Sequence, residues 1–260
     1  MKLSVLVDNN RNGKFNSEHG LSYLIECDNQ KILFDTGQSP LFLKNASLLG
    51  YDLSTDIETI VLSHGHYDHG NGLEFIRNKN LIVHPEAFIK RQRKKDNSEI
   101  GLSLTKEEIE SRFNLITTRA SYNITENLIF LGEIPRLNNF ESQTTDFRKT
   151  NGEDDFIIDD SALVYKKDDE IIVISGCAHS GICNIIEYAK KITGIEKIKT
   201  VIGGFHLKYY DELTKQTIQY LKNEIIEKLY PAHCTSFDAV QVLSEEFRTD
   251  KVKAGITLEF

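Results

Sequence analysis

The sequence predicts an α/β fold with two β-sheets in contact and helices on the outside, as one domain over residues 1–260. Three observations lead to this prediction. Short apolar runs typical of strands recur from one end of the chain to the other. Two stretches with apolar residues at three- and four-residue intervals are typical of amphipathic helices. No repeat or low-complexity linker divides the chain, so we expect one layered domain rather than two independent ones.

The first part of the chain is predicted to form strands and one helix. Residues 28–30 (Asp-Asn-Gln) provide a turn between two strand-like runs, which favours an antiparallel pair. Ser39 and Pro40 indicate a helix start, because serine caps a helix and proline suits its first position, and this helix should end near Gly50. The predicted strands are KLSVLV (2–7), LSYLIEC (21–27), KILFDTG (31–37), IETIVLS (57–63) and LIVH (81–84), and the helix is LFLKNASLL (41–49).

The region around residues 90–119 is polar and charged, and we expect a helical insertion that covers the core. Within it, Thr105 and Glu108 have the spacing of a capping box, in which each side chain bonds the backbone of the other. The basic run KRQRKK at residues 90–95 has two interpretations. It is either a solvated helix end or loop, or a rim that attracts anions beside a site.

The remainder of the chain returns to strand patterning, with two amphipathic helices among the strands. A hairpin turn is expected around residues 167–169. The predicted strands are LIFLGEI (128–134), the hairpin ALVYKKDDEIIVIS (162–175), TVIGGF (200–205), KLYPAH (228–233) and ITLEF (256–260). The predicted helices are ICNIIEYAKKI (182–192) and ELTKQTIQYLKNEIIEKL (212–229).

Composition narrows the class of partner. The net charge of −8 argues against broad binding to nucleic acid or anionic membranes, because phosphate surfaces repel an acidic chain. No apolar run has the length of a membrane span, and we see no secretion signal, so we expect a cytoplasmic protein with a small-molecule substrate. The sequence does not indicate an oligomeric state. The four cysteines lack CxxC spacing and are expected to be free thiols, with a structural zinc site at Cys177, Cys183 and Cys234 as the alternative.

The segment SHGHYDHG (63–70) concentrates metal-binding side chains at the end of a predicted strand. Imidazole and carboxylate are ligands for zinc, iron and manganese. His64 and His66, two positions apart in a loop, can turn the same way and hold one ion, while Asp68 and His69 can face a second ion. Gly65 permits unusual backbone angles and leaves room beside the metals.

Three further histidines each follow a short apolar strand and have small residues beside them. His179 lies in SGCAHSG, His206 in GGFHL and His233 in PAHCT. One such histidine is compatible with a core position. Three in the same context are better explained as strand-end loops that converge on one cleft.

Together, ILFDTG, VLSHGHYDHG and the distant His179 and His233 resemble the metallo-β-lactamase fold superfamily and its HxHxDH signature. More narrowly, HGLSYLIE, GCAHSGI and GGFHL resemble a branch of metal-dependent hydrolases. That branch includes proteins similar to the dihydropterin ribofuranosylaminobenzene phosphate synthase of methanopterin biosynthesis. The resemblance covers essentially the whole chain and implies a four-layer αββα sandwich.

The resemblance also implies a ligand set for two divalent ions, zinc in the first place and iron or manganese as alternatives. It puts His64, His66 and His179 around the first ion, and Asp68, His69 and His233 around the second. Asp35 would orient the site by hydrogen bonding. The superfamily often has a metal-bridging aspartate where this chain reads GGFHL. We expect His206 to act there, as a ligand or as a hydrogen-bond partner of the substrate, and the second ion to bind more weakly.

Several other residues are candidates for the pocket. His19, His84, Asp8 and Asn9 either line it or have surface and packing roles. The pair at residues 159–160 (Asp-Asp) either caps the next strand as a turn, or one member, Asp160 in particular, supplies the missing acid.

Such a site predicts a metal-dependent hydrolase, because a hydroxide held between two ions attacks an electrophilic carbon or phosphorus. Asp68 would orient the nucleophile, and His206 would assist catalysis. The expected substrate is an ester-type or phosphoester bond in a small, phosphate-bearing molecule. The alternatives are an iron-dependent oxidoreductase on the same fold, a pterin-pathway synthase, and a binding protein that uses the metal only to hold a ligand.

Overall fold

The computed structural model describes residues 1–260, which divide into two compact units that are each described by themselves. Unit 1 comprises Met1–Arg119, Thr145–Asp155 and Val252–Phe260, and unit 2 comprises Ala120–Thr144 and Phe156–Lys251. Each unit is assembled from segments that are far apart in the sequence. The expectation of one domain over residues 1–260 stays a prediction.

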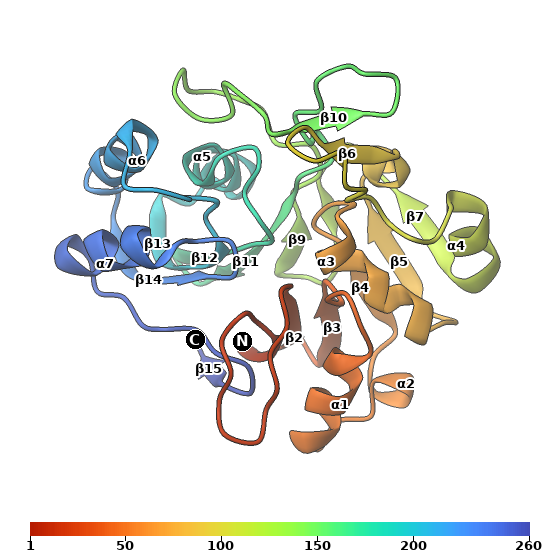
Figure 1. The fold of residues 1–260 in the computed structure, drawn as a ribbon. Helices are drawn as coiled ribbons and strands as arrows, with labels where there is room; N and C mark the ends of the chain where they lie inside the picture. Colours follow the sequence, from red (N-terminus) through yellow and green to blue (C-terminus); the bar gives the residue numbers. More distant parts are fainter. The chain divides into compact units, whose positions relative to one another are not determined.

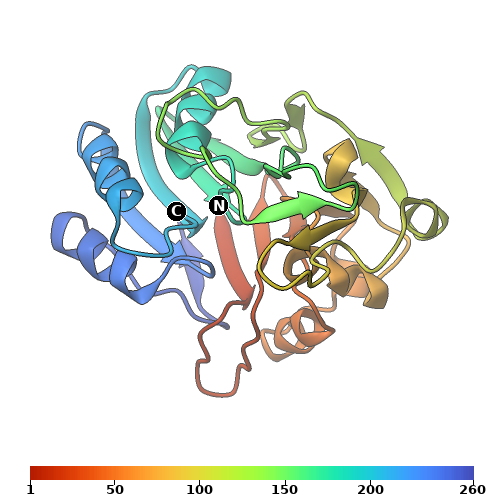
Figure 2. The same ribbon diagram turned by 45° about the horizontal axis from the view of Figure 1, so that its top comes forward.

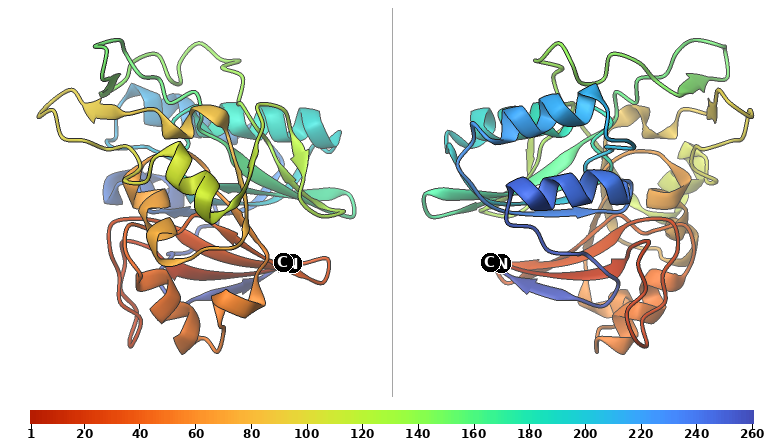
Figure 3. Two further views of the ribbon diagram at one scale, coloured as in Figure 1. Left: turned by 90° about the vertical axis from the view of Figure 1, so that its right-hand side faces the viewer. Right: turned by 60° about the vertical axis from the view of Figure 1, so that its left-hand side comes forward.

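Unit 1 contains a seven-stranded mixed sheet (Figure 1). Its strands are, in spatial order, β15 (Thr257–Glu259), β1 (Lys2–Val7), β2 (Ser22–Cys27), β3 (Gln30–Phe34), β4 (Thr59–Val61), β5 (Asn80–Val83) and β7 (Asn114–Thr117). The strands from β15 to β3 pair antiparallel, and those from β3 to β7 pair parallel. The turn between β2 and β3 uses the positive φ angles of Asp28 and Asn29, as a tight hairpin requires. Both chain ends belong to this sheet, where the amino group of Met1 donates to the carbonyl of Phe260 at 3.1 Å (Figure 3).

Helices of unit 1 pack their apolar residues on this sheet. They are α1 (Leu41–Leu48), α2 (Leu53–Asp56) and α4 (Lys106–Arg112), with the 3-10 helices η1 (Asn71–Phe75) and η2 (Pro85–Phe88), whereas the short helix α3 (Tyr67–Gly70) buries Asp68, His69 and Gly70 instead. Phe42 and Ala46 of α1 share a buried cluster with Leu24 and Leu33 of the sheet. The helix begins one residue later than predicted, with Pro40 at the cap position, and the backbone N–H of Leu41 donates to the hydroxyl of Ser39 at 3.2 Å.

The expectation of a helical insertion over residues 90–119 is wrong for most of its length. Only α4 is helical, and it carries the predicted capping box. The basic run instead forms strand β6 (Arg91–Arg93), which pairs antiparallel with β10 (Phe147–Lys149) in a two-stranded sheet (Figure 2). Arg91 is buried, and its Nε lies 3.2 Å from a carboxylate oxygen of Asp155. This ion pair and the strand pairing involve residues more than fifty positions apart, which a local sequence pattern does not reveal.

Unit 2 contains a six-stranded mixed sheet. Its strands are, in spatial order, β14 (Ile226–Ala232), β13 (Lys197–Gly204), β12 (Glu170–Ser175), β11 (Ala162–Lys167), β9 (Leu128–Phe130) and β8 (Tyr122–Asn123). The strands β12, β13 and β14 run parallel, and the others pair antiparallel. Consequently the carboxyl ends of β12, β13 and β14 lie at the same edge of the sheet.

Three helices cover one face of the unit 2 sheet, namely α5 (Ile182–Thr193), α6 (Glu212–Leu221) and α7 (Phe237–Glu246) (Figures 1 and 3). Ile185 of α5, Leu221 of α6 and Leu243 of α7 share a buried cluster with Val173 and Val201 of the sheet. Each unit therefore contains one sheet layer and one helical layer. No helix combines the length and the apolar character that crossing a membrane requires.

Two expectations for unit 2 are corrected. The helix predicted over residues 212–229 ends at Leu221, and its last residues belong to β14. The apolar spacing of this stretch suits a helix, but Ile226 and the residues that follow pair with β13, and the parallel ladder decides their conformation. The helix α7 was not predicted, although Ser236 caps it by accepting a hydrogen bond from the backbone N–H of Ala239.

Candidate metal centre

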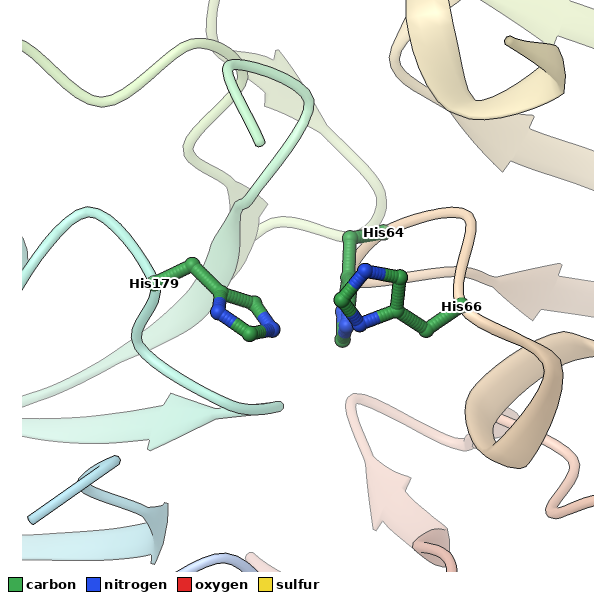
Figure 4. Close-up of side chains that lie close together, drawn as sticks. All are labelled: His64, His66 and His179. Carbon is green, nitrogen blue, oxygen red and sulfur yellow. The ribbon is translucent and has the colours of Figure 1, made fainter. Parts of the chain in front are cut away.

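The segment predicted to bind metal runs from the loop after β4 into the short helix α3 of unit 1. All four of its candidate ligands are buried, with relative exposures of 0% for His64 and His69, 5% for His66 and 6% for Asp68. The ring centroids of His64 and His66 lie 4.5 Å apart (Figure 4), and those of His64 and His69 lie 4.3 Å apart. The structure therefore gathers these imidazoles within one turn of unit 1, as expected from their spacing.

A hydrogen-bond network beneath this loop determines which ring nitrogens carry protons. The Ser63 hydroxyl donates to the Asp35 carboxylate at 2.7 Å, so it accepts from Nδ1 of His64, which lies 2.9 Å away. Nδ1 of His69 donates to the same carboxylate at 2.6 Å. In the neutral form of both histidines, Nε2 therefore carries the lone pair that binds a metal ion. Asp35 has the position of the orienting carboxylate that the resemblance implies.

The charge state of the loop also suits a metal ion. Burial lowers the pKa of His64 well below its ordinary value, and the neighbouring His69 and His66 lower it further, so this imidazole is neutral near pH 7. Burial alone would lower the pKa of His69 as well, but the charges of Asp35 and Asp68 outweigh that effect and raise it. A bound cation would replace the proton that these carboxylates favour on His69.

A glycine is required at position 65 because the loop lies directly against the backbone of Ala87. A Cβ atom at Gly65 would lie 1.8 Å from the carbonyl oxygen of Ala87. Gly70 is also confined, since its Cβ would lie 2.3 Å from a methyl group of Leu102. The glycines that flank the histidines thus allow the loop to pack directly on adjacent backbone and side chains.

Asp68 lies close to two candidate histidines, His19 outside the segment 63–70 and His69 within it. Nε2 of His19 lies 3.1 Å from Oδ2 of Asp68, and Nε2 of His69 lies 3.9 Å from the same atom. The bond to Asp68 raises the pKa of His19. Asn9 accepts from the backbone N–H of Gly20 at 3.2 Å, and so holds the turn that presents His19.

The remaining candidates of unit 1 have other contacts. His84 is buried, and its Nδ1 accepts from the N–H of Glu86 at 3.2 Å as the cap of η2. Asp8 accepts from the backbone and side chain of Asn10, both at 2.9 Å. A pocket role for either residue stays a prediction. Phe147 of β10, which was not predicted at the site, has its ring centroid 4.9 Å from that of His66.

In unit 2, the three strand-end histidines follow the parallel strands. His179 comes after β12 (Figure 4), His206 after β13 and His233 after β14. Left-handed backbone occurs in each loop, with φ of 53° at Ala178, 53° at His206 and 49° at His233. Non-glycine residues rarely adopt this conformation, and such strain is concentrated at functional sites.

Hydrogen bonds join these loops within unit 2. The N–H of Gly204 donates to the carbonyl of Gly176 at 3.0 Å, and the N–H of Phe205 donates to the hydroxyl of Thr235 at 3.0 Å. The ring of His206 lies beside that of His179 and is tilted by 57° relative to it, with centroids 4.4 Å apart. His206 is thus next to a predicted ligand, which is compatible with both roles expected for it.

Asp160 supports the loop that carries His179. Its carboxylate is fully buried and accepts from the N–H and the hydroxyl of Ser180, at 2.9 and 2.6 Å. Burial raises the pKa of Asp160 to about 6, against the opposing effect of the bonds from Ser180. Of the two roles expected for residues 159–160, this geometry agrees with a cap, although the cap is on the His179 loop rather than on the next strand.

Two cysteines lie beside the histidines of unit 2. Ligating atoms of Cys177, His233 and Cys234 all lie within 4.8 Å of one another. Cys183 is instead buried in the apolar cluster of α5, so the zinc site considered for Cys177, Cys183 and Cys234 does not form as a group. All four cysteines are free thiols, as predicted. The sequence could have indicated that these two cysteines lie near the histidines, because Cys177 lies two residues before His179 and Cys234 directly follows His233.

Comparison with known proteins shows the family to which this chain belongs. A family model described as the metallo-beta-lactamase superfamily matches residues 17–190. The chain belongs to the metallo-β-lactamase superfamily. The predicted fold class is confirmed, because two mixed sheets with seven α-helices form the α/β fold of this superfamily.

The more similar members of the superfamily match nearly the whole chain. An uncharacterised protein of Methanocaldococcus jannaschii is 36% identical over 251 residues, which are 94% of each chain. The 7,8-dihydropterin-6-methyl-4-(beta-D-ribofuranosyl)-aminobenzene-5'-phosphate synthase of the same organism is 33% identical, over 96% of this chain and 92% of the relative. The crystal structure of Tm1679, described as a metal-dependent hydrolase of the beta-lactamase superfamily, has a TM-score of 0.88 and 33% identity, over 100% of this chain and 99% of that chain.

Proposed function

We propose that this chain is a metal-dependent hydrolase with a dinuclear centre. The observation that carries the proposal is the network of Asp35 and Ser63, which presents Nε2 of buried histidines in one turn. The proposed ligands of the first ion are His64, His66 and His179, and those of the second are Asp68, His69 and His233. Zinc is the proposed metal, because imidazole and carboxylate donors suit it.

When bound, the metal ions would lower the pKa of a coordinated water and stabilise negative charge that develops on the substrate. The chain's own residues then have separate roles. Asp35 holds the imidazole of His69, and through Ser63 that of His64, in the ligating orientation. Asp68 accepts a proton from the attacking water or orients it, and His19 at 3.1 Å modulates the charge of Asp68. His206, packed against His179, hydrogen-bonds the substrate.

The proposed substrate is a small molecule with an ester-type or phosphoester bond. The hydrolase class is supported by the likeness to Tm1679, whose description is a metal-dependent hydrolase. The phosphate is supported by the name of the Methanocaldococcus relative, whose product carries a 5'-phosphate. That relative also favours a second candidate function, a synthase of the pterin pathway.

The test is a comparison of metal-stripped protein with protein reloaded with zinc, manganese or iron. Each form is assayed against phosphodiesters, lactones and thioesters. We expect hydrolysis in at least one reloaded form, its abolition by a chelator, and a loss of at least about 100-fold in His66→Ala. His84→Ala, which also removes a buried imidazole, should keep its metal content.

Other outcomes would contradict the proposal. Full turnover by metal-free protein would exclude metal-dependent catalysis. Stoichiometric iron with oxygen uptake, in protein purified without air, would favour the oxidoreductase. Condensation of a pterin substrate without hydrolysis of any ester would favour the synthase.

A further inference from the structure

The thiols beside His233 form a compact group at one edge of the unit 2 sheet. Sγ of Cys177, a ring nitrogen of His233 and Sγ of Cys234 lie within 4.8 Å of one another. Cys177 and His233 are buried, and Cys234 is half-buried. Cys177 follows β12, and the other two follow β14, so the group spans the ends of strands that flank β13.

The absence of a side chain at Gly204 leaves space for the sulfur atoms between these strands. A Cβ atom at Gly204, at the end of β13, would lie 2.5 Å from Sγ of Cys234 and 3.2 Å from Cα of Cys177. The Cys234 thiol already points across this gap, since it donates to the carbonyl of Cys177 at 3.4 Å. The bond from Gly204 to Gly176 holds the two loops in this arrangement at 3.0 Å.

Two sulfur atoms and one imidazole are a ligand set for thiophilic divalent ions. Sulfur atoms bound to one tetrahedral zinc ion at ~2.3 Å lie about 3.8 Å apart. Because no two of these atoms are more than 4.8 Å apart, small side-chain rotations can bring all three to one ion. These three ligands leave at least one further position on the ion for another ligand.

We propose that Cys177, His233 and Cys234 form a thiolate site for a divalent ion, so that the ion bound at His233 takes sulfur ligands. This inference rests on the proposed function only in sharing His233 with the second metal position. The site also explains how this chain compensates for the metal-bridging aspartate that is missing from GGFHL, because two thiolates supply the negative charge that an aspartate would bring. Binding releases the two thiol protons to solvent.

Cobalt(II) tests this site without any substrate, because cobalt–thiolate bonds give an intense near-ultraviolet charge-transfer band that imidazole and carboxylate do not give. Metal-free full-length protein is titrated with cobalt(II). We expect the band in the wild type, about half of it in Cys177→Ser and in Cys234→Ser, and a loss of at least about 10-fold in the double variant. Cys27→Ser, a buried thiol of β2 in unit 1, is the matched control and should keep the full band.

A second measurement covers the case in which the double variant does not fold. In the wild type, zinc should slow alkylation of Cys177 and Cys234 by iodoacetamide at least about 10-fold, as mapped by mass spectrometry, and should leave Cys27 unchanged. Cobalt bound without the band, or alkylation unaffected by zinc, would overturn the thiolate site even if the enzyme hydrolyses esters. A band in protein without hydrolase activity would support the thiolate site and count against the hydrolytic function instead.

Discussion

The two units present their metal-binding side chains in different ways. Unit 1 places four donors within six consecutive residues, His64 to His69, and orients two of them, His64 and His69, through one carboxylate, Asp35. Unit 2 places one histidine at the end of each of three parallel strands, with left-handed backbone in each loop. The first arrangement depends on a single turn, whereas the second depends on the register of a sheet.

This difference predicts that substitutions in the two units affect the metal ligands differently. In unit 1, a change that displaces the turn should disrupt every ligand at once. In unit 2, a change at one strand end should act mainly on the histidine of that loop and, through bonds such as that from Gly204 to Gly176, to a lesser extent on the neighbouring loop.

The largest effect is expected for Gly65→Ala. The new Cβ would meet the Ala87 carbonyl oxygen at 1.8 Å, so the turn must move and its ligands with it. We expect a loss of metal binding and of activity by at least about 100-fold, and a destabilisation of about 2–4 kcal/mol. Metal analysis and chemical denaturation measure both. Gly101→Ala, whose nearest contact would be 3.3 Å, is the control, and equal behaviour of the two variants would disprove the role of the turn.

A pH effect is expected from Asp160 in metal-free protein. Its folded-state pKa of about 6 exceeds the ordinary value of 3.8, so the folded protein holds a proton that the unfolded chain has released. The free energy of unfolding should therefore fall as the pH rises from about 4 to about 6, by about 2–3 kcal/mol. Asp160→Asn should remove this slope in denaturation curves. An unchanged slope would show that another group causes it.

Asp35→Asn should act on both His64 and His69. The amide keeps the shape of the carboxylate but removes the charge that raises the pKa of His69. We expect metal affinity to fall about 10–100-fold, as for other residues that orient metal ligands. Competition with a chelator measures it. Unchanged affinity would mean that the network with Ser63 does not determine the ligating orientation.

The smallest effect is expected for His206→Asp in unit 2. Aspartate tolerates the left-handed backbone at this position, where φ is 53°, and it restores the acid that the superfamily often has. We expect the weaker of the two bound ions to bind about 10-fold more tightly, since a carboxylate adds a charged ligand. Calorimetric titration with zinc should resolve the change. Weaker binding would indicate that the imidazole of His206 is itself a ligand.

Much of the fold was predictable from sequence because it depends on local patterns. The strands β1 to β5, the hairpin of β11 and β12, and α1 and α5 follow from apolar periodicity and turn residues. The basic run was misassigned because β6 has its partner in β10, more than fifty residues later. The end of the helix predicted over residues 212–229 was misplaced because Ile226 and the residues after it pair with β13 in a parallel sheet.

The cluster of donors in unit 1 could be predicted from the sequence alone, because residues at spacings of one and two are neighbours in any turn. His179, His206 and His233 were also predictable, because each follows an apolar strand. The contact between the rings of His206 and His179 and the approach of Cys234 to Cys177 across Gly204 instead depend on the tertiary structure. Parallel register between β12, β13 and β14 brings together residues that are 27 and 57 positions apart, and no local spacing encodes that register.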